Sequence, residues 1–237
     1  MLAMQDRITR RFRRVTDDGE RGLTLVELLV AILIFGLLLV MVGGAFSTIS
    51  RTITLATNTN QNVSFSSLGM SEMQKVLRFA STNPVLGNPL DDPAFVSVNN
   101  EALTVYSYVD ASASNPVPVK VSFALDSQRR LVETRYSAYS VATGYYAFNA
   151  TPYLTRILTG TVLAPATGEP YLFTYLDANN NALATSTLTT QTAIRKIAAV
   201  QVRLKIKGNT TNGANPIVLT NTVGLPNLGI SRTGQDI

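Results

Sequence analysis

The chain has 237 residues, enough for one folded domain and an anchor but too few for several independent cores. It contains neither Cys nor His, which excludes thiol nucleophiles, disulfides, Cys/His zinc sites and His-based acid–base catalysis. The net charge is +5, but six basic and four acidic residues precede residue 23, so the remainder carries only +3. We therefore expect no enzymatic activity, no cofactor and no metal, and the charge alone indicates no particular partner.

The first predicted element is an apolar helix near the N-terminus. Residues 28–46 form an unbroken run of nineteen apolar or small residues, and about 20 helical residues cross the hydrocarbon core of a bilayer. The cluster of Arg before this run predicts a cytoplasmic N-terminus, with everything after the run outside the membrane. Small residues at 42–45 would also fit the cleavage site of an ordinary secretory signal peptide, so composition alone leaves that alternative open.

One acid, Glu27, stands at the head of the apolar run. A carboxylate costs about 2.5–3.5 kcal/mol at the centre of a bilayer and less near the interface. One interpretation is that Glu27 lies at the level of the headgroups and stabilises the helix N-terminus through the macrodipole.

The boundary in front of the run carries a more specific pattern. Its residues are Gly22, Leu23, Thr24, Leu25, Val26 and Glu27. With the basic leader and the apolar run, this pattern resembles the type III signal of type IV prepilins and type II secretion pseudopilins. The resemblance implies that a prepilin peptidase cuts after Gly22, leaves the apolar segment in the mature protein and N-methylates Leu23. The family most often has Phe at the position of Leu23.

The same resemblance implies a role for the residues after the cut. Glu27 would pair with the freed α-amine of an adjacent subunit during filament assembly, because an unpaired charge in an apolar bundle is strongly unfavourable. Thr24, Leu25 and Val26 would belong to the same assembly region. The partners implied are prepilin peptidase, other pilin or pseudopilin subunits, and membrane lipid before assembly.

No Pro occurs between Leu23 and Pro84, so one helix from about residue 24 to about residue 80 is predicted. The polar segment 56–62 is a poor helix former, so a break or weak turn there is the alternative. The pair Gly43 and Gly44 is consistent either with a flexible point or with close helix packing. Further on, a helical stripe suited to cover a sheet is formed by Phe65, Leu68, Met73, Val76, Leu77 and Ala80.

After Pro84 the pattern changes to the period of two that is typical of strands. Strands are predicted at 103–108, 119–125, 131–136, 171–176 and 197–206, with a hairpin turn at 126–130 and loops at 140–170 and 207–217. The predicted fold class is α+β, a pilin-like roll in which a long N-terminal transmembrane and assembly helix packs on an antiparallel sheet. The predicted parts are a leader at 1–22, a transmembrane helix at 23–46, its continuation at 47–82 and an extracytoplasmic β-rich domain at 83–237.

The order of the later segments resembles the minor branch that includes pseudopilin J of type II secretion. The supporting segments are 175–180, 197–206 and 222–227. Many members of this branch have a basic residue before the last Asn, where this chain has Pro226.

Two polar clusters raise other functions. Asp177, Asn179 and Asn181 match the first half of a calcium loop, but Ala182 and Leu188 replace the required Gly and acid, so a hairpin turn is the favoured interpretation. A turn is likewise favoured for residues 91–93.

The basic residues Arg195, Lys196, Arg203, Lys205 and Lys207 indicate either a solvated strand face or a DNA-binding surface. Six tyrosines could add a stacking or adhesive surface, though sheet packing explains most of them: Tyr106, Tyr108, Tyr136, Tyr139, Tyr145 and Tyr146.

The favoured function is that of a minor pilin or pseudopilin of a type IV pilus or type II secretion pseudopilus. It would lie in the bacterial inner, cytoplasmic membrane as a single-pass protein and then in the filament. The alternatives are a filament-tip adhesin or DNA-uptake pilin, and an unrelated signal-anchored surface protein in which Gly22 is not cut.

Overall fold

The computed structural model describes residues 24–109, 116–207 and 216–228. The predicted leader, with Gly22 and Leu23, lies outside the described residues. The chain divides into two compact units, residues 1–53 and 54–237, and each is described by itself.

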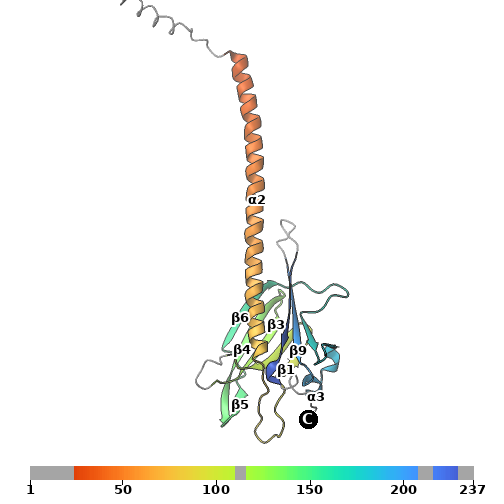
Figure 1. Ribbon diagram of the computed structural model, residues 1–237. Helices are drawn as coiled ribbons and strands as arrows, with labels where there is room; N and C mark the ends of the chain where they lie inside the picture. The colour runs from red at the N-terminus through yellow and green to blue at the C-terminus, as the bar shows by residue number, and fades with distance from the viewer. Residues whose placement is uncertain (1–23, 110–115, 208–215, 229–237) are drawn as a thin grey trace, which may run out of the picture. The chain divides into compact units, whose positions relative to one another are not determined.

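One helix, α2, runs from Leu25 to Arg78 (Figure 1). Its length confirms the long helix predicted from the lack of Pro. The alternative of a break at residues 56–62 was wrong, because the helical hydrogen-bond pattern continues through them. Weak helix propensity in Thr and Asn costs only tenths of a kcal/mol per residue, and neighbouring turns override it. The helix also continues through Gly43 and Gly44, which leaves their two interpretations open.

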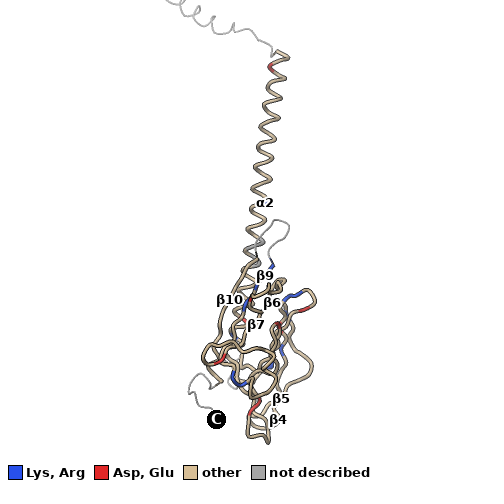
Figure 2. Tube along the Cα trace, turned by 90° about the vertical axis from the view of Figure 1, so that its right-hand side faces the viewer, with Lys and Arg blue, Asp and Glu red and all other residues tan. Residues whose placement is uncertain are grey.

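The part of α2 in the first unit is apolar on all sides. An 18-residue window within Leu25–Thr57 has a mean hydropathy of 3.1, and the stretch is long and apolar enough to cross a membrane. Its side chains are exposed, including Val26 at 69% and Phe35 at 61%. Between Glu27 and Arg51 it carries no charged residue (Figure 2). A helix that is hydrophobic all round is suited to lipid or to other apolar helices.

The second unit contains two antiparallel sheets. The first consists of β1 (Phe95–Val98), β2 (Ala102–Ser107), β3 (Val119–Leu125), β4 (Arg130–Ala142), β5 (Tyr145–Phe148) and β6 (Leu154–Thr161). Its strand order is β1-β2-β3-β4-β5, and β6 also pairs with β4. The second consists of β7 (Phe173–Leu176), β8 (Ala182–Leu183), β9 (Ala199–Ile206) and β10 (Ile217–Gly224), in the order β10-β9-β7-β8.

A bridge between Val162 and Ile206 connects the end of β6 to β9 and so joins the two sheets. Three short helical segments complete the described elements: η1 (Thr185–Thr187), α3 (Gln191–Ile194) and η3 (Pro226–Leu228). The α+β class predicted from the sequence is therefore confirmed, and the arrangement is consistent with a pilin-like fold.

The end of α2 covers the inner face of the first sheet and completes one hydrophobic core. Met73, Val76 and Leu77 are fully buried in the same cluster as Val105, Val121 and Phe123. Ser107 Oγ donates a 2.7 Å hydrogen bond to the carbonyl of Val76, which fixes the helix against β2.

Two members of the predicted stripe do not join this core. Phe65 and Leu68 are 59% and 68% exposed. The buried face instead follows Ser66, Gly69, Met73 and Val76 at the spacing of three or four residues that keeps side chains on one side of a helix. Phe65 is one residue from this face, about 100° around the helix, so including it was wrong.

The five predicted strands are confirmed as β2, β3, β4, β7 and β9; the bounds of β3 agree and those of the other four are shifted. The prediction of a loop at 140–170 was wrong, because this segment contains the end of β4 and the whole of β5 and β6. Exposed and buried residues in β6 are grouped rather than alternating, so the period of two is absent there. Strands β1 and β10 were not predicted, and most of the predicted loop at 207–217 lies outside the described ranges.

Candidate processing and assembly site

The first turn of α2 contains a reciprocal cap. The backbone N–H and the hydroxyl of Thr24 donate to Glu27 Oε2 at 3.0 and 2.9 Å, and the backbone N–H of Glu27 donates to Thr24 Oγ1 at 3.2 Å. This Thr-x-x-Glu arrangement is a capping box, which satisfies N–H groups that no helical turn can pair. The spacing of Thr24 and Glu27 in the sequence contains the motif, although we had not predicted the cap itself.

The cap leaves one carboxylate oxygen of Glu27 available. Within the part of the chain that the structure describes, Oε1 accepts no hydrogen bond, whereas Oε2 accepts both bonds from Thr24. A carboxylate has about four lone-pair sites, so Glu27 can keep its cap and still bind a cation. The two interpretations of Glu27, a stabiliser of the helix N-terminus and an assembly contact, are therefore chemically compatible.

The other residues predicted for assembly surround this cap. Leu25 and Val26 are 79% and 69% exposed and point away from any contact within the described chain. Thr24 and Glu27 form the polar cap of the first turn, and Leu25 and Val26 begin the apolar surface of the helix. Gly22 and Leu23, the predicted processing residues, lie outside the described residues.

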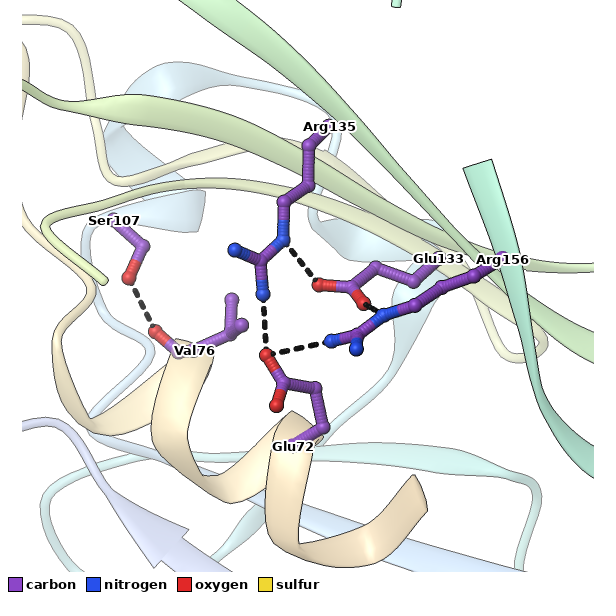
Figure 3. Close-up of polar contacts among 6 residues, drawn as sticks. All are labelled: Glu72, Val76, Ser107, Glu133, Arg135 and Arg156. Carbon is purple, nitrogen blue, oxygen red and sulfur yellow. Dashed lines mark hydrogen bonds and ion pairs between the residues drawn. The ribbon is translucent and has the colours of Figure 1, made fainter. Parts of the chain in front are cut away.

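A second polar cluster, the Glu133 network, attaches the end of α2 to the first sheet (Figure 3). Glu133 on β4 is fully buried and accepts hydrogen bonds from Arg135 Nε at 2.7 Å and Arg156 Nε at 2.5 Å. Both arginines also form ion pairs with Glu72 on α2, Arg156 at 3.0 Å. Two acids and two bases thus neutralise one another where burial makes an unpaired charge costly.

Electrostatics in this network favour the charged state of Arg135. Burial works against its charge, but the hydrogen bond and the charge of Glu133, with the charge of Glu72, raise the pKa of Arg135 above its usual value. Sequence reasoning missed this network. The only signal in the sequence was the alternation of β4. Glu133 lies two residues from Leu131 and two from Arg135, so all three share one face of the strand.

Close packing reinforces the attachment of α2. A Cβ added at Gly69 would lie 2.8 Å from Thr159 Cγ2 and 2.9 Å from the carbonyl oxygen of Leu158. Only Gly allows this approach of the helix to β6. Together with the Glu133 network, Gly69 fixes the position of α2 residues 66–78 on the sheet.

The polar clusters considered in the sequence have structural roles. Asp177 Oδ1 accepts from the backbone N–H groups of Asn179 and Asn181, both at 2.8 Å, which forms the hairpin turn between β7 and β8. At the other predicted turn, Asp92 pairs with Asn83 through two backbone hydrogen bonds and closes the loop 84–91. The described residues contain no group of three or more potential metal-binding side chains.

Two cations of the basic strand β9 share one acid within the fold. Glu169 forms ion pairs with Arg203 at 3.3 Å and Lys205 at 2.8 Å, and both cationic side chains are mostly buried. The bond from Lys205 is the main cause that lowers the pKa of Glu169 to about 2. Two of the cations on which the DNA-binding interpretation depended are therefore engaged with an acid.

Comparison with known protein families identifies the prokaryotic N-terminal methylation motif at residues 18–43. A comparison with curated proteins gave no match. The motif covers the predicted cleavage site, the capping box and the first part of α2. It supports assignment of the chain to the type IV pilin and pseudopilin class, as a prepilin-type protein with N-terminal methylation and a transmembrane helix.

The assignment carries coarse consequences for partners and location. The motif implies processing by prepilin peptidase and assembly with other pilins. With the apolar helix, it supports membrane anchoring of a soluble C-terminal domain.

Proposed function

We propose that this protein is a minor pilin or pseudopilin subunit, cleaved after Gly22 and built into a type IV pilus or type II secretion pseudopilus through its apolar helix. The observation that carries the proposal is the methylation motif at residues 18–43, which leads directly into α2. The proposed role is structural and non-enzymatic. The bacterial inner membrane, a cytoplasmic N-terminus and the branch of pseudopilin J belong to the same proposal.

The mechanism begins in the membrane. The capping box of Thr24 and Glu27 reduces the cost of a carboxylate at the start of an apolar helix, because two donors already bind Glu27 Oε2. Cleavage after Gly22 creates an α-amine on Leu23. Glu27 Oε1 of one subunit can then accept from the α-amine of the next, and this pairing in an apolar bundle selects one axial register.

Mass spectrometry of the mature protein tests the processing step. We expect a chain that begins at Leu23 and carries one added methyl group. Gly22→Ala should retain the leader, whereas the matched control Gly19→Ala, in the same leader, should be processed normally. An intact N-terminus in the wild-type protein from cells with an active prepilin peptidase would refute the proposal.

Incorporation into filaments tests the assembly step. Glu27→Ala should be inserted and processed but absent from sheared filaments, because the mature α-amine then has no carboxylate partner. Glu101→Ala, which removes an acid from the β-rich unit, is the control and should be incorporated normally. Normal incorporation of Glu27→Ala would remove Glu27 from the mechanism.

A further inference from the structure

The outer face of the first sheet carries a group of aromatic residues around one lysine. In the register of the sheet, Tyr106 on β2 lies opposite Lys120 on β3, and Lys120 lies opposite Tyr136 on β4. Their neighbours Val105 and Val121 are fully buried against α2. Because side chains alternate along a strand, the aromatic group lies on the face away from the end of α2.

The aromatic side chains are held in a fixed arrangement. The rings of Tyr106 and Phe148 are stacked, with centroids 4.7 Å apart and an interplanar angle of 14°. Lys120 Nζ lies 4.5 Å from the ring centre of Tyr136 and 5.9 Å from that of Phe148. Stacking and cation–π attraction keep these side chains in place before any ligand arrives.

All of this group except Tyr136 lines a pocket of about 440 Å³, within the range of small-molecule sites. Tyr106, Lys120 and Phe148 contribute from the sheet. The loop that Asn83 and Asp92 close forms another part of the lining, and the β4–β5 hairpin forms the remainder. The pocket therefore combines a rigid aromatic wall with polar side chains.

Two charged groups in the pocket have no partner of opposite charge. Within the described ranges, neither the Asp92 carboxylate nor Lys120 Nζ forms an ion pair. Burial, with the charge of Asp92, raises the pKa of Tyr106. Its hydroxyl, like any ordinary Tyr hydroxyl, is a hydrogen-bond donor at neutral pH. The Asp92 carboxylate and the Lys120 ammonium give the pocket one charge of each sign, one hydrogen-bond acceptor and one hydrogen-bond donor.

Asn83 adds a polar side chain to the lining of the pocket. Its side chain is 95% buried and its Nδ2 donates to the carbonyl of Tyr146 at 3.3 Å, but among the described residues its Oδ1 has no hydrogen-bond partner. A buried carbonyl oxygen without a donor is rare in folded proteins.

We propose that this pocket binds a neutral sugar unit of a polysaccharide or glycan. A sugar ring has an apolar C–H face for the aromatic wall and vicinal hydroxyls that can donate as a pair to the Asp92 carboxylate. Lys120 would donate to a ring or hydroxyl oxygen. A phosphate-bearing ligand such as DNA fits less well, because the single cation is accompanied by an anion.

The proposal does not depend on the proposed filament function. The pocket lies on the sheet face opposite the end of α2, and none of its residues belongs to the processing and assembly site. A subunit that binds sugar without cleavage at Gly22 would refute the filament function alone. A processed subunit without sugar binding would refute this inference alone.

Saturation-transfer NMR on the full-length chain tests the site. The protein is purified in lauryldimethylamine oxide, since detergents with sugar headgroups would compete. The probes are the methyl glycosides of glucose, galactose, mannose and N-acetylglucosamine at millimolar concentration. We expect saturation transfer to the ring C–H protons of at least one probe, and no transfer to any of them would overturn the proposal.

Variants locate the binding. Asp92→Asn, which replaces a charged acceptor with a neutral one, should weaken affinity about tenfold. Phe148→Leu removes the aromatic face and should weaken binding similarly, and Lys120→Met provides a third variant that keeps the aliphatic stem over the rings. Tyr171→Leu, an aromatic loss outside this pocket, is the matched control. Unchanged binding in Asp92→Asn and Lys120→Met would also overturn the proposal.

Discussion

Glu133 lies opposite Arg156 in the β4–β6 pair, and its buried carboxylate accepts a 2.5 Å hydrogen bond from Arg156 Nε. The pairing matters because Arg156 also reaches Glu72 on α2, so one arginine links two strands and the helix. Part of any force transmitted along the end of α2 in an assembled filament would reach the sheet through this network.

The first prediction concerns Glu133. Glu133→Gln leaves Arg135 and Arg156 with one acid between them, and loss of one partner of a buried pair costs about 3–5 kcal/mol. We expect a decrease of this size in the free energy of unfolding. Urea unfolding of the full-length chain in detergent, followed by tyrosine fluorescence, measures it, because the chain has nine Tyr and no Trp.

The matched control is Glu101→Gln. Glu101 pairs with Arg129 at 2.5 Å, but both side chains are more than a third exposed. An exposed pair contributes about 0–1 kcal/mol, so this variant should unfold almost like the wild type. Equal losses in the two variants would contradict the role assigned to the buried network.

The second prediction concerns the contact of Gly69 with β6. Gly69→Ala should destabilise the protein by about 1–3 kcal/mol, because the new methyl group meets backbone and side-chain atoms of Leu158 and Thr159 at under 3 Å. Thermal unfolding of the full-length chain measures the loss. Gly44→Ala is the control: nothing lies within 4 Å of its added Cβ, so Ala should be neutral or stabilise the helix by up to about 1 kcal/mol. A Gly69→Ala protein as stable as the wild type would show that β6 can move away.

These contacts also show which features could be predicted from the sequence. The helix, the confirmed strands and the prepilin motif depend on local patterns, which a single sequence displays. The burial of Glu133 and the close approach at Gly69 depend on segments more than 60 residues apart. Strand β6 was missed because its exposed and buried residues do not alternate. It forms a strand because it pairs with β4, which the sequence alone does not show. The exposure of Phe65 could not be predicted, because a shift of one residue along the helix moves a side chain from the buried face to the exposed one.

The candidate site divides in the same way. The spacing of Gly22 and Glu27 is local and was sufficient to predict the processing and assembly residues, which stay predictions. The basic residues of β9 were conspicuous in the sequence, but their partner Glu169 lies in a loop more than 30 residues away. Only the fold could show that Arg203 and Lys205 both pair with Glu169.

The third prediction concerns pH and Glu169. Its pKa is lowered from the usual 4.5 to about 2 in the folded chain, chiefly by the bond from Lys205. A lowered pKa in the folded state gives stability that is fully present above about pH 4.5 and is lost as the pH falls towards 2. Glu169→Gln should therefore be less stable than the wild type at neutral pH, and the difference should shrink over this window. Urea midpoints measured across the window check it, and a constant difference would contradict the assignment.

The last prediction concerns the cap at the start of α2. Thr24→Val removes the hydroxyl that donates to Glu27 Oε2 and accepts from the backbone N–H of Glu27, while keeping the size and branching of the side chain. We expect the amide of Glu27 to exchange its hydrogen faster in the variant, because loss of a cap costs about 0.5–2 kcal/mol. Thr24→Ser keeps the hydroxyl and should exchange like the wild type.

Hydrogen exchange measured by NMR on the subunit in detergent distinguishes the two variants. Equal exchange in all three proteins would mean that the cap does not form in the membrane-like environment. Because the cap reduces the cost of the Glu27 carboxylate at the start of the apolar helix, Thr24→Val should also lower the amount of subunit recovered in sheared filaments, and Thr24→Ser should not.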